Sequence, residues 1–248
     1  MVPIDFGEHI TVEAELSDQT ELALTCTEPS LSCDEDNLAI RAARSFLETY
    51  GLTAEGSIHI EKQLPVGGGL GGGSSNGATV LLALRQLLLP ESTDEELAKL
   101  AAQFGSDTSF FIYQTPAICR GRGEIIDPIT LRQTYHGLLV RPGFGVSTPW
   151  AFKTYASDPK VGESGAELED GTVLRNDLEP PVFSKYLWLP MAKTWIQEQE
   201  EVVDALMSGS GSSLFAITKN RMAAEALAKR FSSEFGDEML VRPFSVKP

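Results

Sequence analysis

The residues with the clearest chemical potential form one glycine-rich segment. Residues 65–75 read Pro-Val-Gly-Gly-Gly-Leu-Gly-Gly-Gly-Ser-Ser, so six glycines surround one leucine and two serines follow. Glycine tolerates positive φ and lets backbone N–H groups approach an anion closely. The apolar stretch after the serines predicts a helix, whose first N–H groups lack partners and carry about half a positive charge. This glycine segment therefore predicts a cradle for a phosphate group.

Phosphate-binding loops are of several kinds, and the residues here distinguish them. A P-loop ends in Gly-Lys-Ser or Gly-Lys-Thr, whereas this segment ends in Gly-Ser-Ser and has no lysine. A dinucleotide fingerprint, Gly-x-Gly-x-x-Gly, matches formally from Gly67, but the acidic residue at the expected distance, Glu91, follows a proline rather than ending a strand. A flexible hinge does not explain why the glycines stop abruptly at a helix. A kinase-type loop that ends in Gly-Gly-Ser-Ser remains.

The composition limits the kinds of partner that this chain can have. A formal net charge of −15 over 248 residues argues against nucleic acid, because phosphate backbones need clustered Lys and Arg. A small phosphorylated ligand needs only a local positive field. No apolar run approaches the roughly 20 residues of a membrane span. The first residues do not resemble a signal peptide, and the three cysteines lack metal-type spacing, so we expect a cytoplasmic chain with free thiols and no membrane partner.

The elements that must position the glycine segment follow from hydrophobic periodicity and capping residues. The run from Asp34 to Asn37 is expected to cap one helix and Gly51 to end it, and residues 92–96 offer two overlapping capping boxes for a later helix. Helices and strands mix without a strict alternation, which favours an α+β fold. We expect a domain boundary within residues 142–147, and so an N-terminal domain over 1–142 and a C-terminal domain over 143–248. A polar loop is expected over 157–171. Expected helices cover 38–50, 73–88, 92–105, 149–155, 188–207 and 223–235, and expected strands cover 57–62, 110–113, 117–120, 138–142, 214–218 and 239–244, with two more within 10–24.

Several further motifs carry a resemblance to a known family. The glycine segment resembles the Pro-x-x-x-Gly-Leu-Gly-Ser-Ser loop of the GHMP kinase superfamily, in a doubled triple-glycine form. That form is typical of the branch that phosphorylates 4-diphosphocytidyl-2-C-methyl-D-erythritol. The order and spacing of the motifs fit from about residue 4 to residue 244. Similar motifs lie at residues 35–43, 104–111, 121–124, 142–149, 176–179 and 207–213.

The resemblance implies both a fold and a reaction. It implies a two-lobed α+β GHMP kinase fold with the active site in the cleft between the lobes. It implies ATP-dependent phosphorylation of the 2-hydroxyl of 4-diphosphocytidyl-2-C-methyl-D-erythritol, in the non-mevalonate route to isoprenoid precursors, with Mg²⁺ accompanying ATP. Another GHMP kinase, acting on mevalonate or homoserine, and a nucleotide-binding remnant without transfer activity are the alternatives.

The resemblance also assigns roles to individual residues. Asp107 matches the catalytic acid/base of the family, and a carboxylate within reach of an alcohol can accept its proton. Without the resemblance, an Asp after Gly-Ser is interpreted as a turn or cap residue. Asn37 and Lys62 lie near the nucleotide base, or are surface residues. Phe152 stacks on the cytosine of the substrate, or belongs to the core. The resemblance places Mg²⁺ near Ser74 and Ser75, unless these serines only cap the helix. It places substrate near Gly209, Ser210 and Gly211, unless these residues form a plain turn. The residues that it places around the ATP phosphates are Pro65, Val66, Gly67, Gly68, Gly69, Leu70, Gly71, Gly72, Gly73, Ser74 and Ser75.

The beginning of the chain departs from the family's pattern. The superfamily opens with Pro-Ala-Lys-x-Asn-Leu and a Gly-Tyr-His segment, and that lysine pairs with the catalytic aspartate. Residues 1–6 read Met-Val-Pro-Ile-Asp-Phe, and the first lysine of the chain is Lys62. A start codon assigned too late or a truncated chain explains the difference, and so does a lineage that has lost the segment. In each case we expect a weak or inactive catalyst, because a phosphoryl-transfer site that lacks a cation loses orders of magnitude in rate.

Overall fold

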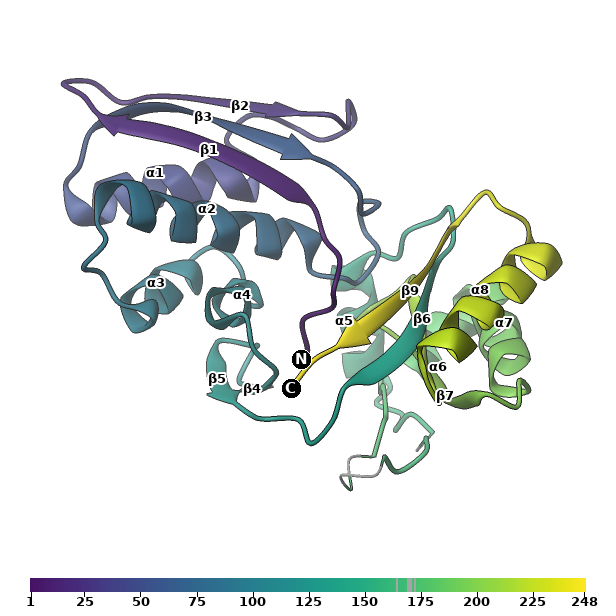
Figure 1. Ribbon diagram of the computed structural model, residues 1–248. Coiled ribbons are helices and arrows are strands. Elements are labelled where there is room, and N and C mark those ends of the chain that lie inside the picture. Colours follow the sequence, from purple (N-terminus) through teal and green to yellow (C-terminus); the bar gives the residue numbers. More distant parts are fainter. Residues whose placement is uncertain (164, 169–170, 172) are drawn as a thin grey trace. The chain divides into compact units, whose positions relative to one another are not determined.

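The computed structural model describes residues 1–163, 165–168, 171 and 173–248 (Figure 1). The chain forms two compact units, and it crosses between them inside the glycine segment. The last crossing, at Thr130–Leu131, precedes the boundary expected at residues 142–147. Unit 1 contains residues 1–3, 7–64 and 71–130, and unit 2 contains residues 4–6, 65–70 and 131–248.

Unit 1 is a three-stranded sheet covered on one face by two long helices (Figure 1). The strand order is β1-β3-β2, in which β1 runs antiparallel and β2 parallel to the central strand. The parallel pair requires a crossover, which α1 provides. Two short helices and a two-stranded ribbon complete the unit. Its elements are β1 (His9–Leu16), β2 (Glu21–Cys26), α1 (Leu38–Tyr50), β3 (Ala54–Glu61), α2 (Gly72–Leu88), α3 (Asp94–Ala101), α4 (Thr108–Tyr113), β4 (Ala117–Arg120) and β5 (Ile125–Pro128).

The local signals at the helix ends of unit 1 act as expected. Asn37 caps α1 by accepting a hydrogen bond from the Ala39 N–H, and Gly51 ends the helix at φ 63°. Thr93 and Glu96 form a reciprocal capping box at the start of α3. The apolar faces of α1 and α2 then bury a core against β3. The side chains at its centre include Phe46, Ile58, Ile60, Leu81 and Leu84.

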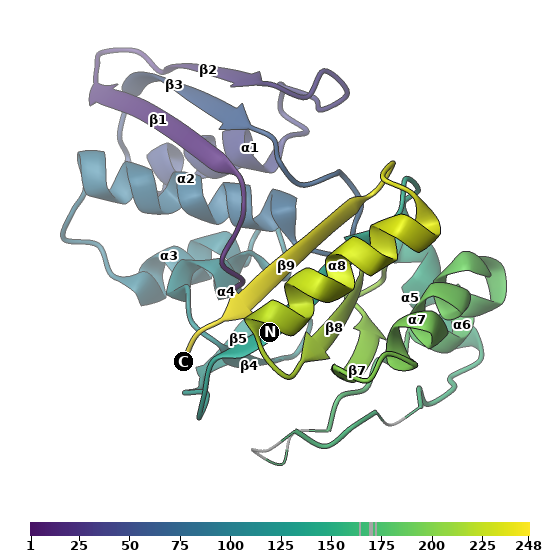
Figure 2. The ribbon, with the colours of Figure 1, turned by 45° about the vertical axis from the view of Figure 1, so that its right-hand side comes forward.

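Unit 2 is a four-stranded antiparallel sheet of order β7-β8-β6-β9 with four helices on one face (Figure 2). Alternate residues of β6 divide the two sides: Leu138 and Val140 face the helices, whereas Leu139 packs with Phe244 on the other side. The elements are β6 (Tyr135–Arg141), α5 (Thr148–Ser157), α6 (Glu179–Lys185), α7 (Trp188–Gln197), β7 (Val202–Met207), β8 (Leu214–Thr218), α8 (Arg221–Phe235) and β9 (Leu240–Val246).

Two expected elements are wrong. The expected strand at 110–113 is helix α4, because Phe110 and Ile112 are buried against helices, and a short apolar run does not distinguish strand from helix by period. The expected helix over 188–207 ends at Gln197, and its last part is strand β7, which pairs with β8. Sheet pairing outweighs local propensity there. Of the loop expected over 157–171, residues 164 and 169–170 lie outside the described residues. Apart from Ser157, which ends α5, the others hold no helix, and Glu167 forms one isolated bridge with Val173.

Candidate active site

The first turn of α2 is open to an anion. Gly71 precedes the helix at φ 68°, no side chain caps the turn, and the turn itself contains no acidic residue. A Cβ atom on Gly71 would lie 2.8 Å from the Phe111 ring, so this position requires glycine for space as well as for φ. The N–H groups and the positive end of the helix dipole therefore meet at Gly72, Gly73 and Ser74, as the sequence predicts.

A buried polar cluster lies beside this turn. The Lys62 ammonium pairs with Glu8, and the second oxygen of Glu8 accepts a hydrogen bond of 2.6 Å from the Asn76 amide. A Cβ atom on Gly72 would lie 3.6 Å from the Lys62 Nζ. Burial lowers the pKa of Lys62 to about 8. Lys62 is therefore not a surface residue, and its contact with a nucleotide base stays a prediction.

Asp107 lies on a loop that packs against the same turn of α2. A Cβ atom on Gly105 would lie 3.6 Å from the Ser74 Oγ, and one on Gly123 would lie 2.8 Å from the Asp107 Oδ1. Although Asp107 precedes α4, its side chain makes no cap hydrogen bond. Burial raises the pKa of this half-buried carboxyl group. Asp107 is thus a carboxylate with no cap role beside the anion-binding turn, which suits a general base.

Both polar groups of the Asn37 side chain form hydrogen bonds within the protein. Its Oδ1 accepts the hydrogen bond that caps α1, and its Nδ2 donates one of 2.7 Å to the Ser32 carbonyl. The next residue, Leu38, reaches the first turn of α2, where its Cδ1 would lie 3.6 Å from a Cβ atom on Gly73. The buried Asn37 therefore orients the start of α1 against α2, and its contact with a nucleotide base stays a prediction.

The first half of the glycine segment, residues 65–70, packs on a turn at residues 208–213 in unit 2. Ser208 Oγ donates to the Gly69 carbonyl at 2.9 Å, and the Ser213 N–H donates to the Gly68 carbonyl at 3.1 Å. Gly69 has φ 73°, and a Cβ atom there would lie 2.3 Å from the Ser208 carbonyl oxygen. The turn at residues 208–213, predicted to lie near the substrate, therefore supports the glycine segment directly.

The Asn-Asp-Leu-Glu motif at residues 176–179 holds this turn in place. The Asn176 amide donates to the Met207 and Gly209 carbonyls at 2.7 and 2.8 Å. Glu179 accepts the Met207 N–H at 2.8 Å and forms a buried ion pair of 2.7 Å with Lys193. The motif quoted for the resemblance thus has a structural reason, because it satisfies the backbone that leads into the turn.

The two other predicted substrate contacts differ in exposure. Phe152 on α5 is 56 % exposed, so the ring is available to a ligand and is not a core side chain. Ser210 is buried, and its hydroxyl lies 2.7 Å from that of Thr148. Gly211 has φ 83° and packs against the Met207 sulfur, where a Cβ atom would lie 2.7 Å away. Their contacts with substrate stay predictions.

Sequence reasoning missed two residues that touch the glycine segment. Glu8 lies in an irregular stretch with no motif, and only the fold brings it to Lys62 and Asn76. The sequence places Arg141 only at the end of a strand, whereas in the structure its guanidinium donates to the Val66 carbonyl at 2.7 Å. The sequence signal that points to Arg141 is a basic residue directly before the Pro-Gly of residues 142–143.

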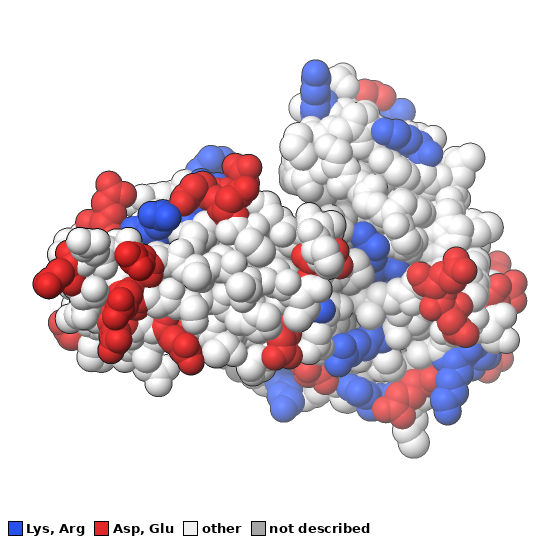
Figure 3. Space-filling model, turned by 90° about the horizontal axis from the view of Figure 1, so that it is seen from above, with Lys and Arg blue, Asp and Glu red and all other residues white. Residues whose placement is uncertain are grey.

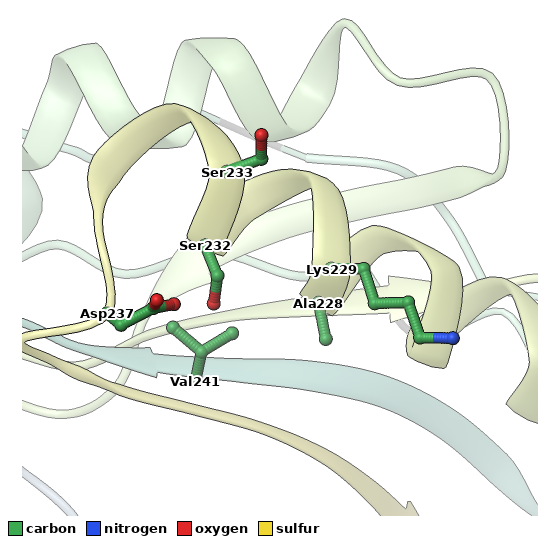
Figure 4. A pocket seen from close by; sticks show the side chains of 6 residues that line it. All are labelled: Ala228, Lys229, Ser232, Ser233, Asp237 and Val241. Carbon is green, nitrogen blue, oxygen red and sulfur yellow. The ribbon is translucent and has the colours of Figure 1, made fainter.

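Other surface features do not compete with this site. On the face shown in Figure 3, acidic side chains gather in several clusters, in keeping with the net charge of −15. No helix among the described residues is long and apolar enough to cross a membrane. A shallow depression between α8 and β9 contains no predicted site residue (Figure 4). Its lining consists of Ala228, Lys229, Ser232, Ser233, Asp237 and Val241.

Comparisons with known proteins match both halves of the chain. Residues 37–115 match the GHMP kinases N terminal domain, and residues 160–237 match the GHMP kinases C terminal family. The fold is similar to a crystal structure of a homoserine kinase from Cytophaga hutchinsonii, with a TM-score of 0.77 and 17% identity over 99% of this chain and 88% of that one. Fold and motifs thus define a GHMP kinase, which is an ATP-dependent small-molecule kinase.

Similar sequences and a solved structure narrow the family. The chain is 47% identical to the 4-diphosphocytidyl-2-C-methyl-D-erythritol kinase of Methylacidiphilum infernorum, over 88% of this chain and 76% of the relative. It is 35% identical to the enzyme of that name from Protochlamydia amoebophila, over 99% and 83%. A crystal structure of 4-(cytidine 5'-diphospho)-2C-methyl-D-erythritol kinase matches with a TM-score of 0.82 and 29% identity, over 100% and 88%. The chain belongs to the 4-diphosphocytidyl-2-C-methyl-D-erythritol kinase family of the GHMP kinases.

Proposed function

We propose that this chain transfers the γ-phosphoryl group of ATP to the 2-hydroxyl of 4-diphosphocytidyl-2-C-methyl-D-erythritol. The observation that carries the proposal is the position of Asp107, a half-buried carboxylate on a loop that packs against the open first turn of α2. A base on a loop that packs against an anion-binding turn is what phosphoryl transfer to an alcohol requires. The names of the similar proteins supply the substrate.

The proposed chemistry assigns one step to each group. Asp107 accepts the proton of the 2-hydroxyl while the hydroxyl oxygen bonds to the γ-phosphorus, and the bond from that phosphorus to the ADP oxygen breaks. The N–H groups at Gly72, Gly73 and Ser74 hold phosphate oxygens. They stabilise the negative charge that the transferring group carries, because they are already oriented before ATP binds.

Mg²⁺ fits the oxygen donors at the start of α2. Among the residues that the structure describes, no group of three or more His, Cys, Asp or Glu side chains could hold a metal ion, so the ion would share oxygens of ATP. The hydroxyls of Ser74 and Ser75 are hard oxygen ligands of the kind that Mg²⁺ prefers. When bound, Mg²⁺ offsets charge on the phosphate oxygens.

Substrate recognition is assigned to unit 2. The exposed ring of Phe152 offers a stacking surface for the cytosine, since bases and aromatic rings stack face to face. The backbone at Gly209, Ser210 and Gly211 offers contacts to the rest of the substrate. Both Gly209 and Gly211 have positive φ, so the chain turns sharply and its peptide groups lie close to the surface of the turn.

A panel of alcohols tests the proposed reaction. Purified chain in excess over substrate, with labelled ATP, should phosphorylate 4-diphosphocytidyl-2-C-methyl-D-erythritol but neither homoserine nor mevalonate. Asp107→Asn should lower the transfer rate at least about 100-fold, the usual contribution of a general base. The matched control is Asp18→Asn, which removes the same charge from an exposed turn of unit 1 and should leave the rate unchanged. Transfer to homoserine or mevalonate instead, or ATP binding with no transfer to any of the three alcohols, would refute the proposal.

A further inference from the structure

Arg141 contacts the glycine segment from the end of strand β6. Its Nη2 donates to the Val66 carbonyl at 2.7 Å. Its Cγ and Nε atoms would lie 3.4 and 3.6 Å from a Cβ atom on Gly68, so the side chain runs along the backbone of the segment. The Arg141 side chain therefore lies within van der Waals distance of the Gly68 position.

The charge of Arg141 has no partner within the described part of the chain. Its Nε–H is buried and donates to none of those residues, and no described carboxylate pairs with the guanidinium. Burial lowers the pKa of Arg141. Native folds rarely leave a buried donor and an uncompensated cation in one place, so this arrangement requires an explanation.

A second unpartnered group lies at the same glycine. The hydroxyl of the fully buried Ser213 makes no hydrogen bond with any described residue, and it would lie 3.2 Å from a Cβ atom on Gly68. The backbone N–H of Ser213 already holds the Gly68 carbonyl at 3.1 Å. Two polar side chains, one from the end of β6 and one from the turn at residues 208–213, thus converge on the middle of the first glycine triplet. The Arg141 Nε–H and the Ser213 hydroxyl both lack a hydrogen-bond partner among the described residues.

We propose that Arg141 is a positioning residue for the nucleotide. It holds Val66 and Gly68 in the conformation that binds phosphate, and its uncompensated charge strengthens the attraction of this segment for the negative charge of ATP. The inference rests on the proposed function, because it assumes that phosphate binds on the glycine segment. A purely structural cation would be expected to pair with a carboxylate, as Lys193 does with Glu179.

Nucleotide binding to variants of Arg141 tests this role. Arg141→Gln removes the charge, Arg141→Lys keeps it but loses the planar fork, and Arg132→Gln is the matched control at an exposed arginine of unit 2. Calorimetry with ATP and with adenosine separates the phosphate contribution from that of the base. We expect Arg141→Gln to weaken ATP binding about tenfold, equivalent to about 1.4 kcal/mol, while adenosine binding is unchanged. Arg141→Lys should keep ATP binding within about threefold, because its charge remains.

Turnover and salt dependence complete the test. In Arg141→Gln the KM for ATP should rise while kcat changes little, and ATP binding should lose part of its sensitivity to ionic strength. The proposal is overturned if Arg141→Gln binds ATP like the wild type, or loses ATP and adenosine equally. If Arg141→Gln does not fold, a loss of ATP binding in folded Arg141→Lys as large as tenfold overturns the role of charge. A wild-type chain that binds ATP without transferring phosphate would refute the proposed function, yet the binding comparison would still decide the role of Arg141.

Discussion

Replacing Gly69 by alanine tests whether the glycine segment depends on its contact with the turn at residues 208–213. A Cβ atom on Gly69 would lie 2.3 Å from the Ser208 carbonyl oxygen and 2.9 Å from that of Gly211. Both obstacles are backbone atoms, so the segment must move away. Gly67 provides a matched control, because it has nearly the same backbone angle, φ 75° against 73°, and no atom within 4 Å of its Cβ position.

The magnitude follows from adding the two effects. Alanine at positive φ costs about 1–2 kcal/mol, and this cost applies at both positions. Only Gly69→Ala also displaces the segment from the turn. It then loses the Ser208 Oγ bond to the Gly69 carbonyl and the Ser213 N–H bond to the Gly68 carbonyl, each contributing about 0.5–1.5 kcal/mol. We expect Gly69→Ala to lower the free energy of unfolding by about 1–3 kcal/mol more than Gly67→Ala.

Urea unfolding followed by tryptophan fluorescence measures this difference. All three tryptophans, Trp150, Trp188 and Trp195, belong to unit 2, which also contains both glycines. The KM for ATP, measured in parallel, should rise more for Gly69→Ala than for Gly67→Ala, because the displaced segment no longer presents its N–H groups in one arrangement. Equal losses of stability in the two variants, with equal KM values, would show that the turn does not support the segment.

Three further predictions concern single buried groups. Thr108→Val should raise the free energy of unfolding by about 1 kcal/mol, since the fully buried Thr108 hydroxyl has no partner among the described residues. A thermal unfolding midpoint below that of the wild type would contradict this. Glu179→Ala should lower the free energy of unfolding by about 3–5 kcal/mol, because it leaves Lys193 and the Met207 N–H buried without a partner; an unchanged urea midpoint would count against the network. The transfer rate should fall as pH drops through the pKa of Asp107, which burial raises, and an inflection at the ordinary aspartate pKa would exclude Asp107 as the base.

Local signals predicted much of unit 1. The Asn37 cap, the Gly51 end of α1 and the Thr93–Glu96 capping box each depend on residues within four positions of one another, and each occurs as expected. The helix after the glycine segment also forms where the serines predict it. Such interactions form within a few residues, so their residue types are sufficient to predict them.

The two wrong elements show where local reasoning fails. Residues 110–113 carry an apolar run that suits a strand equally well, and it becomes helical because α4 packs against α2 and α3. Residues 202–207 become a strand because β8 offers an edge for pairing. Both outcomes depend on a partner far along the chain, which period and propensity do not specify.

Residue types and spacing alone predicted a phosphate-binding segment and excluded a P-loop, and the resemblance to the GHMP kinases made Asp107 the candidate base. Those conclusions depend on backbone freedom and on short motifs, which are local properties. Only the tertiary structure decided that Lys62 is buried with Glu8, that Ser208 and Asn176 support the glycine segment, and that Arg141 contributes a cation to it. These contacts join residues from 31 to 139 positions apart, so they form only when segments that are distant in the sequence pack together.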